Sequence, residues 1–455
     1  MREFVPKNIL NQCTEFVKEW KNQWPEFFSD PSLEVSSAHV SRVFQSLFQR
    51  LKKSYPFHYP GYAGQMLKPP HQIAIFAYFA ALHINSNNHA LDGGPATSEM
   101  EIEAVSKLAE MFGFKKYIGH LTGGGTVANM EALWTAREIH PRSSVALGSQ
   151  AHYTHPRVCK ILKLPYFVVR QDLQGRMDLN HLESLLKKHK IGTVVATLGT
   201  TALGALDPLD EILKLKERYR FRVHVDAAYG GFFKLLSQGK SPLVEPSPFK
   251  NISRCDSIVI DPHKHGLQPY GCGCVIFGDP SVGKIYKHDS PYTYFTSNKL
   301  HLGEISFECS RPGAAAAALW TTLNCFPLER SCGMGAVLSR CRSAAIHFTE
   351  LIQKEGTFYP VVQPELDIVA YFHSRKNQMS RISESTHSIF RKAEKDKKFP
   401  VYLSKLQVES EWLKRKFPRL QLDEPQVTVV RSVFMKPEHL NYLGKIYESL
   451  LRNAK

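Results

Sequence analysis

The chain has 455 residues, of which 43% are hydrophobic and 22% charged, the composition of an ordinary soluble globular protein. Lysine and arginine total 58 against 42 acidic residues, and this net charge of +16 raises nucleic acid, membrane surfaces and anionic small molecules as partners. Because the charges are scattered, with no long basic arm or aromatic-interleaved basic stripe, we expect a solvated basic surface and no nucleic-acid partner.

The sequence contains neither a recognisable export signal nor a pattern of paired cysteines. The start, MREFVPKNIL, lacks the apolar core of a secretory signal, and no run of 18 apolar residues predicts a membrane span. The nine cysteines form no paired framework, and Cys272 and Cys274 indicate one face of a packed strand rather than half a zinc site. We therefore expect a reduced cytoplasmic protein without a membrane partner or a metal.

The first ~55 residues are predicted to be helical, since EFVKEWKNQW and VSRVFQSLFQRLKK space their apolar residues at three and four. From about 75 to 320, apolar strand-like runs alternate with amphipathic helices, which is typical of a parallel α/β sheet. Beyond 320 the chain has longer helices and two isolated strands, LDIVAYF and VTVVRSVF. The expected domains are a helical segment at 1–75, a large α/β domain at 76–320 and a smaller α+β domain at 321–455.

Three polar residues follow apolar runs of the large domain. Thr201 ends TVVATLGTT, Asp226 follows RVHV, and Lys264 ends SIVIDPHK, after which CGCVIFGD is expected to form a hairpin partner. Ligands of open α/β sheets bind outside the carboxyl ends of the strands. The three side chains are therefore expected along one rim of the sheet.

A run of three glycines precedes a predicted helix in LTGGGTVANMEALWTAREIH, at 121–140. The backbone amides of Gly124, Gly125 and Thr126 are suited to a phosphate, which the helix dipole also favours. A glycine-rich turn without a phosphate is an equally good interpretation. The run lacks the Gly-Lys-Ser/Thr ending of a Walker motif, and its contiguous glycines do not match a dinucleotide fingerprint.

Asp226 stands after a buried strand beside small residues, where a carboxylate needs a cationic partner to stay charged. A protonated pyridine nitrogen would be such a partner and would make the ring an electron sink. Ala228 would then face the ring by strand alternation. The alternative is a helix N-cap aspartate.

Lys264 is unusual because lysine is seldom buried without a partner. Burial is expected to lower its pKa and make it a competent Schiff-base nucleophile, with His263 as a phosphate donor. The alternative is a lysine that emerges into solvent at the end of the strand.

His152, in SSVALGSQAHYTH, is placed to stack on a cofactor ring or to hold a substrate carboxylate. His152 and His155 also have the spacing of two metal ligands one helical turn apart, but no third ligand or carboxylate completes such a site. A structural histidine is the remaining interpretation.

Taken together, GGGTVAN, AHYTH, TLGTT, HVDAAYGG, DPHK and SRPG resemble the motifs of the group II amino-acid decarboxylases, in the same order, over roughly 60–320. The resemblance implies the pyridoxal-phosphate-dependent transferase fold of type I, that of aspartate aminotransferase. It also implies roles in binding pyridoxal phosphate. Lys264 would form the Schiff base, Asp226 would pair with the pyridine nitrogen, and His152 and Ala228 would lie on the two faces of the ring. Thr201 would contact the ring hydroxyl or the substrate carboxylate, and the phosphate would be bound by Gly124, Gly125, Thr126 and His263.

The segment ECSRPGAAAAALW at 308–320 resembles one of bacterial glutamate decarboxylases and sphingosine-phosphate lyases, which implies that Arg311 reaches the active site. The alternative for Arg311 is an ordinary arginine at a helix start, ahead of Pro312. The family also implies a homodimer whose two subunits share their active sites. The proton donor would be Tyr292 or Tyr294, of which Tyr294 is preferred. Thr296 or Ser297 would contact the phosphate across the interface.

The implied reaction is decarboxylation of an L-amino acid to its amine and carbon dioxide, a step of amino-acid and carboxylic acid metabolism. A lyase that releases an aldehyde and an aminotransferase stay open, as does a catalytically silent or nucleic-acid-binding member. Two departures from relatives put the substrate in doubt, namely His265 after the lysine and the segment DGGPATSEME at 92–101.

Overall fold

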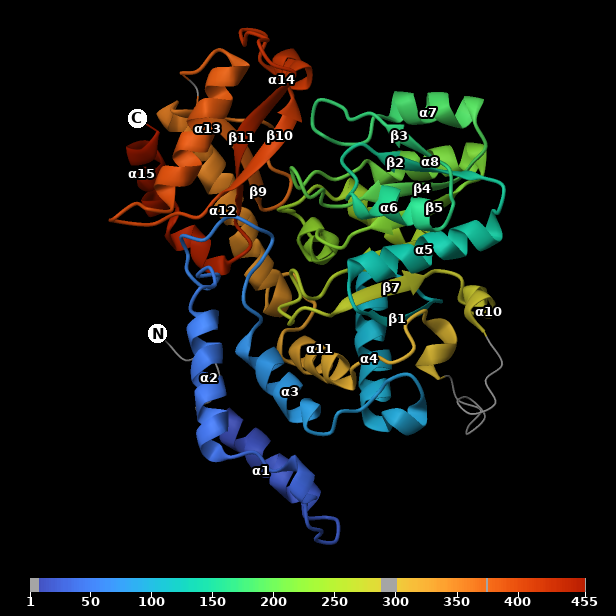
Figure 1. The fold of residues 1–455 in the computed structure, drawn as a ribbon. Coiled ribbons are helices and arrows are strands. Elements are labelled where there is room, and N and C mark those ends of the chain that lie inside the picture. Colours follow the sequence, from blue (N-terminus) through green and yellow to red (C-terminus); the bar gives the residue numbers. More distant parts are fainter. Residues whose placement is uncertain (1–7, 288–300, 374, 455) are drawn as a thin grey trace.

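The computed structural model describes residues 8–287, 301–373 and 375–454. Two sheets organise this part of the chain (Figure 1). The strands of the larger sheet are β1 (Ile118–Thr122), β2 (Ser144–Gly148), β3 (Tyr166–Val169), β4 (Ile191–Thr197), β5 (Arg222–Asp226), β6 (Ser257–Ile260) and β7 (Gly273–Phe277). The strands of the smaller sheet are β8 (Phe358–Pro360), β9 (Ile368–His373), β10 (Ser404–Glu409) and β11 (Gln426–Val433).

Helices occur along the whole chain. Those before the larger sheet are α1 (Ile9–Lys21), α2 (Ser37–Leu51), α3 (Gln72–Leu82) and α4 (Pro95–Phe112). Those between its strands and directly after it are α5 (Gly125–Ile139), α6 (Thr154–Ile161), α7 (Leu179–Lys188), α8 (Leu209–Tyr219), α9 (Ser247–Lys250) and α10 (Gly283–Tyr286). Those that follow are α11 (Gly313–Cys325), α12 (Gly333–Glu355), α13 (Met379–Ala393), α14 (Ser410–Lys416) and α15 (Leu443–Asn453).

The larger sheet has the order β1-β7-β6-β5-β4-β2-β3, and only β7 runs antiparallel to its neighbours. Helices cover both of its faces, which explains why its strands read as continuous apolar runs. Val194 and Ala196 of β4 belong to a core cluster that includes α4, α7 and α8, whereas Val195 packs with α5 and α6. The expected parallel α/β fold is confirmed, as is the hairpin between β6 and β7.

The smaller sheet is antiparallel, with the order β10-β11-β9-β8. The expected strands LDIVAYF and VTVVRSVF are β9 and β11, while β10 was not predicted. The segment at 61–64 joins this sheet, because Ala63 N–H donates to the carbonyl of Tyr402 and Val433 N–H donates to that of Ala63. Domain boundaries at residues 75 and 320 stay a prediction.

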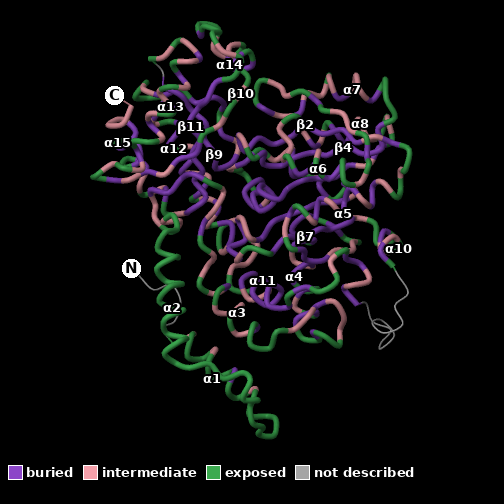
Figure 2. Tube along the Cα trace, in the orientation of Figure 1, coloured by how far each residue is buried: buried purple, intermediate pink, exposed green. Residues whose placement is uncertain are grey.

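The N-terminal helices α1 and α2 confirm the periodicity of the first ~55 residues. In Figure 1 they extend from the body of the molecule, and in Figure 2 they are exposed along most of their length. Val17 of α1 is buried, but no residue of α2 is. Among the described residues, no helix has both the length and the apolarity that crossing a membrane requires.

Candidate active site

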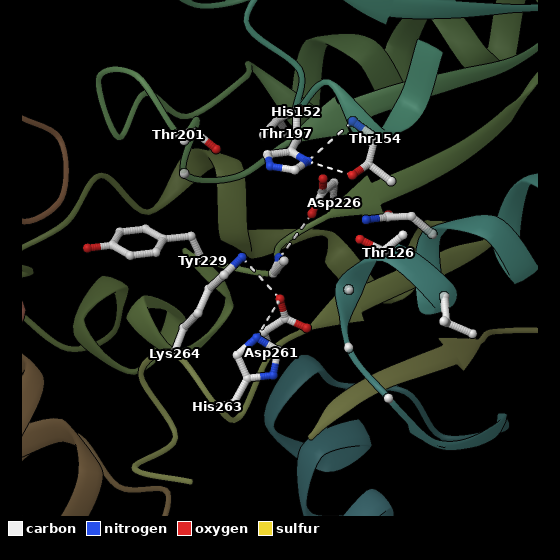
Figure 3. A pocket seen from close by; sticks show the side chains of 17 residues that line it. Thr126, His152, Thr154, Thr197, Thr201, Asp226, Tyr229, Asp261, His263 and Lys264 are labelled. Carbon is white, nitrogen blue, oxygen red and sulfur yellow. Dashed lines mark hydrogen bonds and ion pairs between the residues drawn. The ribbon is translucent and has the colours of Figure 1, made fainter. Parts of the chain in front are cut away.

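A cavity of about 310 Å³ lies at the carboxyl ends of β1, β2, β4, β5 and β6 (Figure 3). Every described residue that is predicted to bind the cofactor lines it. The lining consists of Gly123, Gly124, Gly125, Thr126, Val127, Asn129, His152, Thr154, Thr197, Gly199, Thr201, Asp226, Ala228, Tyr229, Asp261, His263 and Lys264. The structure thus brings together residues that lie up to 141 positions apart, and their individual roles stay predictions.

The glycine turn leads from β1 into α5 and leaves no room for larger residues. Gly124 has a φ of +148°, and a Cβ on Gly125 would lie 2.7 Å from Oδ2 of Asp261. Val127 and Ala128 donate their amides to the carbonyl of Gly124. The amides of Gly125 and Thr126 have no such partner within the described chain, so this helix start can bind an anion.

Asp226 ends β5 and is held by a histidine that the sequence did not single out for this role. Nε2 of His155, in the first turn of α6, lies 2.8 Å from Oδ2 of Asp226, and the amide of Ala228 donates to Oδ1. Burial on its own would raise the pKa of Asp226, but the hydrogen bond and charge of His155 and the charge of Lys264 lower it. Asp226 is therefore an anion at neutral pH.

Lys264 points into the cavity, and Asp261 is its closest ionic partner. The Nζ of Lys264 lies 3.0 Å from Oδ2 of Asp261, three residues earlier in the turn after β6. Burial lowers the pKa of Lys264, but Asp261 and Asp226 raise it, and the result lies above the ordinary value. The expectation that this pKa is lowered is therefore wrong, because it overlooked Asp261 in the motif DPHK.

His152 and His263 lie on different sides of the cavity (Figure 3). Nδ1 of His152 lies 2.8 Å from the hydroxyl of Thr154, which fixes its ring. Burial lowers the pKa of both histidines and favours their neutral forms. Three polar atoms of the lining are buried without a hydrogen-bond partner in the described chain, namely Nδ1 of His263, Oδ1 of Asp261 and the hydroxyl of Thr197. Such unpaired atoms around a cavity fit a polar ligand.

Arg311 does not line the cavity, contrary to expectation. Its Nη1 lies 2.5 Å from a carboxylate oxygen of Glu101 and also donates to the carbonyl of Leu121. Glu101 is buried in α4, where a carboxylate needs a cation, and it therefore holds the guanidinium away from the cavity. Tyr292, Tyr294, Thr296 and Ser297 lie outside the described residues.

Solved structures resemble this one along nearly its whole length. The crystal structure of mouse CSAD in apo form has a TM-score of 0.76 at 20% sequence identity, covering 96% of this chain and 91% of that one. The structure of Oryza sativa TDC with PLP and tryptamine has a TM-score of 0.77 at 16% identity, with both chains fully covered. The fold is thus that of the type I pyridoxal-phosphate enzymes.

Sequence comparisons go further than the fold. The model of the pyridoxal-dependent decarboxylase conserved domain matches residues 57–373. An L-tyrosine decarboxylase of Enterococcus faecium is 28% identical over 79% of this chain and 77% of its own length. A probable L-aspartate decarboxylase of Archaeoglobus fulgidus is 26% identical over 76% and 88%. The chain belongs to the pyridoxal-dependent decarboxylase family, and is accordingly an amino-acid decarboxylase, a carboxy-lyase with pyridoxal phosphate as its cofactor.

The cavity suits this cofactor. The phosphate of the cofactor is an anion, which the start of α5 can bind. The pyridinium nitrogen of the cofactor is a cation, which can pair with the buried carboxylate of Asp226. The amine of Lys264 faces the same space and can bond its aldehyde carbon.

Proposed function

We propose that the chain removes the α-carboxylate of an L-amino acid and releases carbon dioxide and the corresponding amine. The observation that carries this proposal is that the Asp226 carboxylate, the Lys264 amine and the glycine turn of α5 all face one cavity. The family to which the chain belongs supports the same reaction.

Bound pyridoxal phosphate supplies an electron sink for the electron pair left on the α-carbon when carbon dioxide departs. Lys264 would hold the cofactor through Nζ. Asp226, kept anionic by His155, holds a proton at the ring nitrogen and so strengthens the sink. These roles make Lys264 and Asp226 the two residues on which turnover depends most.

The remaining lining residues orient the cofactor and the substrate. The phosphate would be held by Gly124, Gly125, Thr126 and His263, and the two ring faces would meet His152 and Ala228, all of which line the cavity. Thr201 binds the ring hydroxyl or the substrate carboxylate. Tyr294 returns a proton to the α-carbon, a role carried over from the family resemblance.

The substrate is proposed to be aromatic or acidic, since the relatives above are named for L-tyrosine and L-aspartate. The holoenzyme should release carbon dioxide from one class in a panel of L-tyrosine, L-tryptophan, L-aspartate and L-glutamate, with D-tyrosine and D-aspartate as controls. Carbon dioxide and the amine are both measured. Consumption of a 2-oxo acid without release of carbon dioxide, or formation of an aldehyde from the carbon skeleton, would contradict the proposal.

We also propose that two copies of the chain form a homodimer with shared active sites and that α2 contributes to its interface. One face of this helix exposes five apolar side chains, those of Val40, Val43, Phe44, Leu47 and Phe48. An exposed apolar surface of this kind is typical of an interaction site, and twofold dimers are the commonest assemblies.

Phe44→Glu should convert the dimer into a monomer, because it places a charge in the apolar face of α2. Gln49→Glu adds the same charge on the opposite face of the helix and should leave the dimer intact. Light scattering after size exclusion measures the mass of each variant. A wild-type protein with the mass of one chain, or a dimeric Phe44→Glu variant, would contradict the proposed interface.

A cytoplasmic location is proposed as well. All nine cysteines fall in the described part of the chain, and each is a free thiol. Unpaired cysteines are typical of a reducing compartment.

A further inference from the structure

Asp367 is a buried carboxylate between the two sheets. It directly precedes β9, and its exposed fraction is 0%. Oδ1 of Asp367 accepts a hydrogen bond of 2.7 Å from the hydroxyl of Tyr229, and Oδ2 lies 3.2 Å from Nε2 of His265. Its carbonyl accepts the amide of Phe434, just after β11, so its backbone is fixed to the smaller sheet.

The two partners of Asp367 belong to the turns that carry the proposed cofactor residues. Tyr229 is the third residue after Asp226, and its ring lines the cavity while its hydroxyl points away from Asp226 and His152 (Figure 3). His265 directly follows Lys264. One carboxylate of the smaller domain therefore contacts both turns.

Packing leaves these partners little freedom. The ring of His265 is fully buried, and its centroid lies 4.7 Å from that of Tyr229 and 4.9 Å from that of Phe233. Both rings stand nearly edge-on to the imidazole, an arrangement that aromatic pairs favour. A shift of Asp367 would therefore be transmitted to the turns at 226–229 and 261–265.

The charges around Asp367 keep it ionised. Burial on its own would raise the pKa of Asp367, but His265, the hydroxyl of Tyr229 and the charge of Lys68 lower it. Burial and Asp367 together raise the pKa of Tyr229 well above its ordinary value, so Tyr229 keeps its proton as a donor. The contacts of Asp367 are thus maintained at neutral pH.

We propose that Asp367 is a positioning residue through which the smaller domain sets the distance between Asp226 and Lys264. This inference rests on the roles proposed above for those two residues. Asp367 does not line the cavity, so it acts through Tyr229 and His265.

Asp367→Asn tests the proposal because the amide has nearly the same shape but no charge with which to pair with His265, and only one of its two ends can accept from Tyr229. Misplacement of reacting groups by about 1 Å costs up to about a hundredfold in rate. We expect kcat to fall by about that factor while KM changes little, and we expect the apparent Kd for pyridoxal phosphate to rise. Hydrogen exchange of the peptides covering 226–231 and 261–266 should become faster in the protein without added cofactor.

Asp396→Asn is the matched control. Asp396 also belongs to the smaller domain, and its side chain is only 6% exposed. It accepts hydrogen bonds from Arg452, Asn453 and two backbone amides, but it does not line the cavity. This variant should lose thermal stability without faster exchange in the two turns and without weaker cofactor binding. Equal effects of the two substitutions on exchange and on Kd would overturn the proposal.

Tyr229→Phe removes one of the two links with a single-atom change and serves if Asp367→Asn does not fold. It should produce a smaller loss of kcat and faster exchange in 226–231. In the double variant with His265→Phe, which keeps a ring but no donor, a further Asp367→Asn substitution should add little, since both partners are already gone. Wild-type exchange and wild-type kcat in Tyr229→Phe would also overturn the proposal. Because exchange is measured without turnover, this result does not depend on which reaction the enzyme catalyses.

Discussion

Lys264→Ala should yield a protein that neither binds pyridoxal phosphate covalently nor turns over substrate. The reason is that the lysine amine faces the cavity and alanine has no nucleophile to replace it. The visible absorbance band of the lysine-bound cofactor should be absent. Borohydride reduction followed by mass spectrometry should find the cofactor on the peptide containing Lys264 only in the wild-type protein.

Lys240→Ala is a suitable control, because Lys240 is exposed and does not line the cavity. It should retain the absorbance band and full turnover. Turnover by Lys264→Ala at the wild-type rate, or a reduced cofactor attached to another lysine of the wild-type chain, would show that the assignment of Lys264 is wrong.

Asp226→Asn should lower kcat by about a hundredfold to a thousandfold, the usual cost of removing a group that stabilises charge in the transition state. The amide has nearly the same shape as the carboxylate but no longer holds a proton at the ring nitrogen. It also leaves His155 without its anionic partner. The cofactor should still attach to Lys264, so that the covalent band persists while carbon dioxide release falls.

Two comparisons separate this effect from a general loss of structure. Asp256→Asn removes a carboxylate just before β6, at the opposite edge of the sheet, where it pairs with Lys216, and should leave kcat unchanged. His155→Gln keeps a hydrogen-bond donor beside Asp226 and should cost less than Asp226→Asn. Wild-type kcat in Asp226→Asn would remove Asp226 from the mechanism.

Much of the site followed from the sequence because parallel strands bring their carboxyl ends to one edge. Thr201, Asp226 and Lys264 each follow an apolar run, and that placement alone predicted their meeting. Asp261 had a signal that was overlooked, since it stands three residues before Lys264 in the same tight turn.

Other features depend on contacts between distant segments. His155 meets Asp226 across 71 positions, and its spacing from His152 in the sequence does not indicate this contact. The resemblance of the SRPG segment places Arg311 in the active site, but the structure pairs Arg311 with Glu101, which lies 210 positions earlier. The periodicity of α1 and α2 predicted helices correctly, yet it does not specify what their apolar faces contact.

The pairing of 61–64 with the smaller sheet affects how the protein is made. The carbonyl of Gly64 accepts the hydroxyl of Ser404, 340 positions later. At typical synthesis rates of about 5–20 residues per second, roughly 20 to 70 s separate the two residues on the ribosome. The large α/β domain can form during that interval, whereas the smaller domain is completed only after nearly the whole chain has emerged. The 61–64 segment is thus made long before the partners with which it pairs in the folded chain.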